Sequence, residues 1–375
     1  MKKIKVLQLP IVNQRGGITH YAMRNWDFIN KDKFQFDFVT FSKFLDFEDE
    51  LTTEGCKIHY VSCYAEQDRE QFISEIRAIL SEGYDAIHLH TGYWKSFLVE
   101  EIAIELGIPI IIVHAHNIMV GVKDPELREK AIEMHEEQKK LFMPHHATHF
   151  LACSQLAADW LYGSQIPKEQ IRILKNAIDI DKYAYNPGIR EEYREKFGLK
   201  DSFVIGHVGR FVYQKNHEFL LNIFVKISEL IPNVKLMLIG DGEDFNSIKE
   251  AVSTHGLDNR VLLLGQQPDI EVARLMQAMD IFCNPSRFGG LDLTLVEAQT
   301  SGLKCLVTAD IMPESKITAN LEFLPLDIDI WHDAIIELSK GYDRKDCKDI
   351  VANAGYSLTN QIHELEKIYS GQAEI

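Results

Sequence analysis

The sequence reads Asn284-Pro-Ser-Arg-Phe-Gly-Gly-Leu-Asp-Leu-Thr-Leu-Val-Glu-Ala-Gln299 where a buried strand is followed by a Gly-Gly loop and then by a helix. A glycine loop at the start of a helix brings free backbone N–H groups and the positive end of the helix dipole to one point. Such a point binds anions, and a diphosphate suits it. Glu297 lies about two turns further on, where its carboxylate is placed to accept hydrogen bonds from hydroxyls beside the phosphate. The spacing predicts a nucleotide-sugar pocket.

Around this stretch, apolar strand-like runs alternate with helical patterns along nearly the whole chain. This alternation predicts an α/β protein with parallel sheets and crossover helices. The expected strands are Ile4–Leu9, Phe34–Phe41, Ile58–Ser62, Ala86–His90, Pro109–His114, His149–Ala152, Ile171–Lys175, Val204–Val208, Lys235–Ile239, Val261–Leu264, Ile281–Asn284, Lys304–Thr308 and Glu322–Pro325.

The length of 375 residues predicts two domains. A polar stretch that ends in proline, residues 176–187, marks the expected break, and a fresh strand–loop unit starts at Ser202. We expect a first domain over residues 1–178 and a second over residues 179–355. The tail has apolar residues at helical spacing and predicts a final helix within residues 356–375.

Composition limits the classes of function. A net charge of −16 argues against nucleic acid as a partner. No apolar run approaches the ~18 residues of a membrane span, and the N-terminus enters a strand directly, so we expect a cytoplasmic protein. The six cysteines are scattered without a C-x-x-C pair, which argues against structural disulfides and zinc.

Two cations follow the first strand of the second domain. Arg210 and Lys215 are five residues apart across a loop, close enough to converge on one diphosphate, with arginine as a fork and lysine as a point charge. Two solvated surface charges are the alternative.

The stretch that begins at Asn284 resembles the donor-site signature of the retaining glycosyltransferases of family 4. That signature reads Pro-Ser, two residues, Glu-Gly-Leu-Pro, a short apolar run and then Glu-Ala. The matching residues are Pro285, Ser286, Gly290, Leu291, Leu295, Glu297 and Ala298. The resemblance implies the GT-B fold, in which two Rossmann-like domains face each other across a cleft and the C-terminal helix crosses back to the first domain.

The resemblance also implies roles for individual residues. Gly209-Arg210 with Lys215 looks like the family motif whose two cations hold the donor pyrophosphate. Residues expected at the donor are Gly16, Gly17, Gly209, Gly240, Gly242, Gly289, Gly290, Leu291, Asp292 and Glu297. His116 is expected at the donor sugar or the acceptor; a structural polar residue at a strand end is the alternative. The family does not generally need a metal, so we expect neither a metal nor another cofactor.

Gly289 departs from the family pattern, because it stands where the first of two glutamates is usual. Three interpretations stay open. Asp292, in place of the usual proline, supplies the carboxylate; or the donor is unusual and needs the space; or the protein binds a sugar nucleotide with little or no transfer.

Two pairs of histidines are candidate metal ligands. His114 and His116 lie two residues apart at a strand end, as do His88 and His90. The sequence offers the first pair no third ligand at useful spacing, so we expect no metal there.

The resemblance implies a retaining transferase that moves a hexose or N-acetylhexosamine from a UDP-sugar to a saccharide acceptor in cell-surface polysaccharide synthesis. The acceptor would be lipid-linked, with peripheral contact at the inner membrane face. The alternatives are a noncatalytic sugar-nucleotide-binding protein and a UDP-sugar epimerase of the same fold. The sequence does not predict the oligomeric state.

Overall fold

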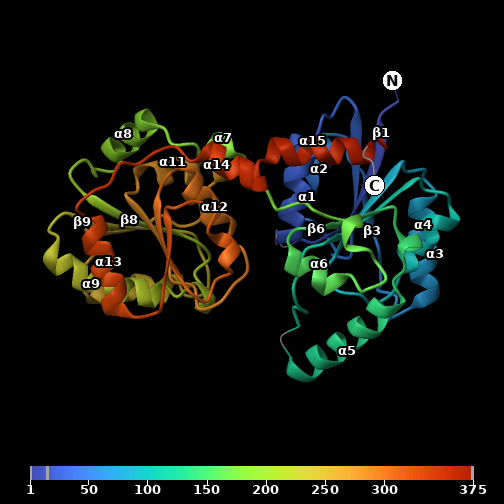
Figure 1. Cartoon of the computed structure of the whole chain (residues 1–375), viewed down its shortest axis with the longest axis horizontal. Coiled ribbons are helices and arrows are strands. Elements are labelled where there is room, and N and C mark those ends of the chain that lie inside the picture. Colours follow the sequence, from blue (N-terminus) through green and yellow to red (C-terminus); the bar gives the residue numbers. More distant parts are fainter. Residues whose placement is uncertain (1, 14–16, 123, 373–375) are drawn as a thin grey trace. The chain divides into compact units, whose positions relative to one another are not determined.

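The computed structural model describes residues 2–13, 17–122 and 124–372, and the chain forms two compact units (Figure 1). Unit 1 comprises Met1–Asn176 and Leu358–Ile375, and unit 2 comprises Ala177–Ser357. The Gly16 prediction lies outside the described residues. None of the helices in the described ranges is long and apolar enough to span a bilayer.

Unit 1 is built on seven parallel strands in the order β3-β2-β1-β4-β5-β6-β7. Their bounds are β1 Ile4–Ile11, β2 Phe34–Thr40, β3 Ile58–Tyr60, β4 Ala86–Thr91, β5 Ile110–Ala115, β6 His149–Ala152 and β7 Ile171–Ile173. Its helices are α1 Gly17–Phe28, α2 Glu48–Thr53, α3 Arg69–Leu80, α4 Leu98–Glu105, α5 Pro125–Leu141, α6 Gln155–Leu161 and α15 Leu358–Tyr369. All seven strands expected here are confirmed.

The two faces of this sheet differ in chemistry. One face carries aliphatic residues such as Leu7 and Ile87, which pack against α3, α4 and α6. Because side chains alternate along a strand, the other face receives Gln8 of β1, His88 and His90 of β4, and His114 of β5. Helices α1 and α15, which contact each other, cover this second face (Figure 1).

Helix α15 confirms the expectation that the C-terminal helix returns to the first domain. Its Tyr369 hydroxyl lies 3.0 Å from Nε2 of Gln8 and 2.7 Å from Nδ1 of His88. The helical stripe in the sequence places Ile362, Leu365 and Ile368 on its buried side. The helix therefore completes the core of unit 1, although unit 2 separates it from the rest of that unit in sequence.

Unit 2 is built on six parallel strands in the order β10-β9-β8-β11-β12-β13. Their bounds are β8 Phe203–Val208, β9 Val234–Ile239, β10 Val261–Leu263, β11 Ile281–Asn284, β12 Lys304–Thr308 and β13 Leu321–Leu324. Its helices are α7 Ile180–Tyr183, α8 Pro187–Lys196, α9 His217–Leu230, α10 Phe245–Thr254, α11 Asp269–Ala278, α12 Leu293–Thr300, α13 Ile328–Leu338 and α14 Lys348–Val351. The six strands expected here are also confirmed.

In unit 2, helices α9, α10 and α13 cover one face of the sheet, and α8, α11 and α12 cover the other. Strand order reverses between β8 and β11, whose following helices lie on opposite faces. The carboxyl ends of two such strands border a crevice in which open α/β sheets bind ligands. The corresponding position in unit 1 lies between β1 and β4.

We expect the free energy of unfolding to fall when the pH is lowered from 7.5 to 5.5. Burial lowers the pKa of four histidines in unit 1, called the histidine cluster: His88, His90, His114 and His116. The unfolded chain binds protons below about pH 6.5 while these folded-state rings stay neutral, so stability is present above that pH and is lost below it. Each ring should cost on the order of 1 kcal/mol at pH 5.5.

Urea unfolding at several pH values measures this loss. Replacing the exposed His145 with glutamine is the control, because that residue lies outside the histidine cluster. A free energy of unfolding that is the same at pH 7.5 and 5.5 would contradict the prediction.

Candidate active site

The candidate site of unit 2 is formed at the carboxyl ends of β8 and β11. Gly209 and Arg210 follow β8 directly, and the loop that contains Gly289 and Gly290 follows β11. Arg210 is exposed at this edge of the sheet. The side chain of Lys215 crosses Gly209, since a Cβ on Gly209 would lie 3.4 Å from its Cδ and Cε atoms. The predicted donor residues that follow β8 and β11 thus border one edge of the sheet.

Lys215 forms an ion pair with Asp292. The residue after Lys215, Asn216, has φ of 58° in the left-handed region, where asparagine is tolerated better than most residues. Nδ2 of Asn216 donates to the carbonyl of Pro285 at 3.2 Å, which ties the first loop to the second. Nδ2 of Asn284 also donates to Asp292, at 3.1 Å. The lysine is therefore held in place by neighbours on both loops.

Asp292 is also the N-cap of α12. Its carboxylate accepts hydrogen bonds from the backbone N–H of Thr294 at 3.3 Å and from the Thr294 hydroxyl at 2.9 Å. Burial alone would raise its pKa, but Lys215 and Thr294 together hold that pKa below its usual value. The sequence predicts that the first backbone N–H groups of this helix are free for a ligand. The N–H of Thr294 is not free, because it already donates to the carboxylate of Asp292.

Space remains where the family glutamate would stand. A Cβ on Gly289 would meet Nε2 of Gln214 at 3.3 Å and Cδ1 of Ile311 at 3.6 Å. The Gln214 amide is the end of a flexible side chain and donates to the carbonyl of Phe288 at 2.9 Å. A Cβ atom at position 289 therefore needs only a small shift of Gln214. Nearby, Leu291 packs against the core and Glu297 is 7% exposed on α12.

Gly240 and Gly242, which are expected at the donor, allow two backbones to pack closely. Gly240 has φ of 136°, and a Cβ there would lie 2.0 Å from the carbonyl oxygen of Gly209. At Gly242 the corresponding distance to the carbonyl of Phe211 is 2.4 Å. Both glycines let the loop after β9 pack against the backbone of the loop that carries Arg210. They support the site by bringing two backbones together.

Unit 1 has a pocket of about 300 Å³ at the carboxyl ends of β1 and β5. Gly17 at the start of α1 and His116 after β5 both line it, so the structure brings these two predicted residues together. Asn117 and Asn176 lie beside them. Burial lowers the pKa of His116 to about 3, so the ring is neutral at physiological pH.

The sequence shows two histidine pairs, one on each of two strands, but the structure brings them together in one group. β4 and β5 are neighbours in the sheet, with His90 opposite His114. Ring nitrogens of His88, His90 and His114 all lie within 4.8 Å of one another. The spacing of His114 and His116 in the sequence does not show this group, because His88 and His90 come from the adjacent strand.

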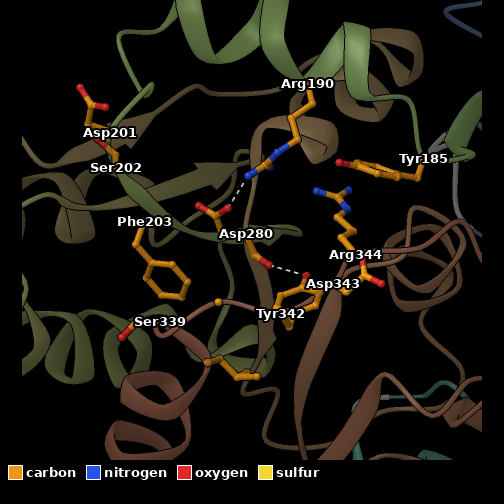
Figure 2. Close-up of a pocket in the computed structure, with 12 residues that line it drawn as sticks. Tyr185, Arg190, Asp201, Ser202, Phe203, Asp280, Ser339, Tyr342, Asp343 and Arg344 are labelled. Atoms are coloured by element: carbon orange, nitrogen blue, oxygen red, sulfur yellow. Dashed lines mark hydrogen bonds and ion pairs between the residues drawn. The ribbon is translucent and has the colours of Figure 1, made fainter.

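The larger pocket drawn in Figure 2 lies away from these residues. Its volume is about 470 Å³, and it is bordered by Phe203, where β8 starts, and Asp280, which precedes β11. Arg190 forms an ion pair with Asp280 at 2.5 Å, and the guanidinium of Arg344 lies 4.5 Å from the ring of Tyr185. It is thus at the amino ends of the strands, and its polar groups hold local structure together.

Comparison with known proteins identifies the family. The model of the glycosyl transferase 4-like domain matches residues 16–177, and the model of glycosyl transferases group 1 matches residues 189–355. The chain is a GT-B glycosyltransferase. Both models describe glycosyl transferases. The first matches unit 1 and the second matches unit 2.

Full-length relatives agree with this assignment. The glycosyltransferase is 29% identical to the "Putative glycosyltransferase EpsF" of Bacillus subtilis, over 99% of this chain and 97% of the relative. It is 25% identical to the UDP-Gal:alpha-D-GlcNAc-diphosphoundecaprenol alpha-1,3-galactosyltransferase of Escherichia coli, over 98% and 97%. The crystal structure of Anabaena Alr3699/HepE in complex with UDP has the same fold, with a TM-score of 0.72, 18% identity and coverage of 99% and 100%.

Sequence reasoning missed three residues that organise this site: Asn216, Asn284 and Thr294. Asparagine directly before a helix was an available signal for Asn216, because it is the residue type that most readily adopts positive φ after glycine. The contacts of Asn284 and Thr294 with Asp292 depend on how the loop after β11 folds.

We expect Gly240→Ala to lower the free energy of unfolding by about 3 kcal/mol, because the new methyl group meets a backbone carbonyl and the φ is unfavourable. Gly290→Ala is the matched control. A Cβ there would meet only Sδ of Met312 at 3.5 Å, an ordinary contact, so its effect should stay within about 0.5 kcal/mol. Chemical denaturation of both variants measures the difference, and equal stabilities would refute the role assigned to Gly240.

Proposed function

We propose that this glycosyltransferase is a retaining, metal-independent enzyme that moves a hexose or N-acetylhexosamine from a UDP-sugar to a saccharide acceptor in cell-surface polysaccharide synthesis. The observation that carries the proposal is the group of residues at the carboxyl ends of β8 and β11. There Lys215 is fixed by Asp292, Arg210 is exposed at the same edge, and the Gly290 loop leads into α12 with Glu297.

The reaction requires stabilisation of the leaving diphosphate while the anomeric carbon becomes positively charged. Arg210, Lys215 and the backbone amides around Gly290 would provide that stabilisation from fixed positions, which is usually the largest catalytic term. With two cations to neutralise the diphosphate, no metal ion is needed. Glu297 would accept hydrogen bonds from the ribose hydroxyls.

Retention would follow from attack on the same face of the sugar that the diphosphate leaves. The leaving phosphate oxygen would then take the proton of the acceptor hydroxyl, and the chain need not supply a nucleophile. In unit 1, the neutral ring of His116 would hydrogen-bond a sugar hydroxyl at its pocket.

Asp292 would replace the carboxylate that is missing at Gly289. Its pKa stays low, it contacts the lysine of the pyrophosphate motif, and Asn284 and Thr294 hold its two oxygens. Three partners fix the position of this carboxylate within the site. This favours compensation by Asp292 over an unusual donor or an inactive protein. The pair also keeps the charge of Lys215 balanced until a donor binds.

The donor and acceptor classes are proposed from the relatives. The Escherichia coli relative is named for a UDP-galactose donor and a diphosphoundecaprenol-linked acceptor. At 25% identity over nearly the full length, it supports a UDP-sugar donor and a lipid-linked saccharide acceptor for this chain. We propose that the chain meets this acceptor at the inner membrane face.

Arg210→Ala should lower kcat/KM for UDP-sugar turnover about 100-fold, because one preorganised cation at the diphosphate is removed. UDP release from a panel of UDP-sugars, with acceptor and EDTA present, is the assay. Lys226→Met is the matched control: this cation of the same unit lies at the surface on α9, pairs with Asp329 and should not affect turnover. Binding of a UDP-sugar without UDP release would favour the noncatalytic alternative, and conversion without an acceptor would favour the epimerase.

Asp292→Asn should lower kcat/KM at least tenfold, because Lys215 loses its charged partner and the site loses its carboxylate. Adding Gly289→Glu to that variant should restore part of the activity, since residue 289 has room for a side chain once Gln214 shifts. Full activity of Asp292→Asn, or a rise in activity from Gly289→Glu alone, would contradict the compensating role of Asp292.

A further inference from the structure

Six side chains on the covered face of the unit 1 sheet form one hydrogen-bonded network. Gln8 lies at its centre and has two branches. Its Oε1 atom lies 2.9 Å from Nε2 of His90, and Nδ1 of His90 lies 3.0 Å from Nε2 of His116. Its Nε2 atom donates to the Tyr369 hydroxyl, which contacts His88, and Nε2 of His88 lies 3.1 Å from Nδ1 of His114.

The first branch fixes where each proton lies. An amide oxygen can only accept, so Nε2 of His90 must carry a proton and donate it to Gln8. A neutral imidazole has a single N–H, and burial keeps His90 neutral, so its Nδ1 is an acceptor. His116 must then donate from Nε2. Its own Nδ1 is left as an acceptor, and no hydrogen bond to Nδ1 is found among the described residues.

The second branch runs in the same way. The Gln8 amide donates to the Tyr369 oxygen, so the hydroxyl proton of Tyr369 is directed to Nδ1 of His88. His88 then donates from Nε2 to His114, whose remaining proton lies on Nε2. Nε2 of His114 is buried and has no hydrogen-bond partner among the described residues, so its N–H is the unpaired end of this branch.

Reversing the Gln8 amide would reverse every donor and acceptor in both branches. His116 would then carry its proton on Nδ1, and so would His114. The two branches are therefore coupled through the amide of Gln8. Its orientation sets the tautomer of His116 through the one residue between them, His90.

We propose that Gln8 is a positioning residue that, through His90, holds His116 with its proton on Nε2 and turns Nδ1 into the acceptor for a sugar hydroxyl. Helix α15 takes part, because Tyr369 holds the amide of Gln8 in this orientation. The sugar hydroxyl as the ligand rests on the function proposed above, whereas the tautomer of His116 does not depend on it.

A metal ion held by His88, His90 and His114 is the competing interpretation of this cluster. Both ring nitrogens of His88 and of His90 already have hydrogen-bond partners, so a cation would have to break those bonds. No carboxylate belongs to the group to balance a divalent charge. The hydrogen-bond network therefore fits the observed contacts better.

Nitrogen-15 NMR of histidine-labelled full-length protein tests the proposal directly, with the His116 signals assigned from a His116→Gln spectrum. We expect Nε2 of His116 to be protonated and Nδ1 to be unprotonated at pH 7.5. A proton on Nδ1 in the wild-type protein overturns the proposal. So does one equivalent of tightly bound metal in the purified protein, measured by elemental analysis and removed by chelation with a change in the cluster signals.

Gln8→Leu should shift His116 toward the Nδ1–H tautomer. Without its acceptor, His90 gains by donating from Nδ1 to His116, since a buried unpaired N–H is less tolerated than an unpaired acceptor. Tyr21→Phe is the matched control, because the Tyr21 ring lies 4.9 Å from that of His116 but its hydroxyl makes no hydrogen bond to the six side chains of the network. A folded Gln8→Leu variant with an unchanged His116 tautomer would overturn the proposal.

Measurements of UDP-sugar turnover test the positioning role of Gln8 separately from the proposed function. We expect kcat/KM for the UDP-sugar to fall about tenfold in Gln8→Leu, the effect of one hydrogen bond to the substrate, and to stay unchanged in Tyr21→Phe. If the tautomer shifts as expected in a protein that transfers no sugar, the positioning role of Gln8 stands and the proposed function fails. If Gln8→Leu does not fold, the tautomer of the wild-type protein still decides the matter.

Discussion

The ion pair between Lys215 and Asp292 holds the centre of unit 2 together. It joins the loop after β8 to the loop after β11, and these are the two strands at which strand order reverses. The same carboxylate caps α12 and accepts from Asn284. One pair of opposite charges therefore sets the path of both loops, the start of a helix and the position of the cation assigned to the diphosphate.

The strands of this glycosyltransferase could be predicted because both faces of its parallel sheets are covered, which makes strands such as Ile281–Asn284 and Lys304–Thr308 continuous apolar runs. The loop motifs could be placed because each follows a strand. The pairing of Lys215 with Asp292 could not, since the two residues are 77 positions apart and meet only when β8 and β11 lie side by side. The same reason explains the histidine cluster, whose members come from adjacent strands.

Glycine positions illustrate a second limit of the sequence. Gly240 and Gly289 are both glycines in loops of the site, and the family resemblance predicts that both lie at the donor. Gly240 is needed because two backbones touch there, whereas Gly289 leaves room for a side chain. The distinction depends on φ and on neighbouring atoms, which residue type does not reveal. In the proposed site, the carboxylate that Gly289 lacks is supplied by Asp292.

The return of α15 has a consequence for how the chain is made. Gln8 and the histidines of β4 and β5 belong to the first part of the chain to leave the ribosome, yet the helix that covers them is encoded after all of unit 2. Until residues 358–369 emerge, one face of the first sheet lacks one of the two helices that cover it. Unit 2, which is continuous in sequence, can close its own core earlier. Unit 1 can therefore complete its core only after unit 2 has been synthesised.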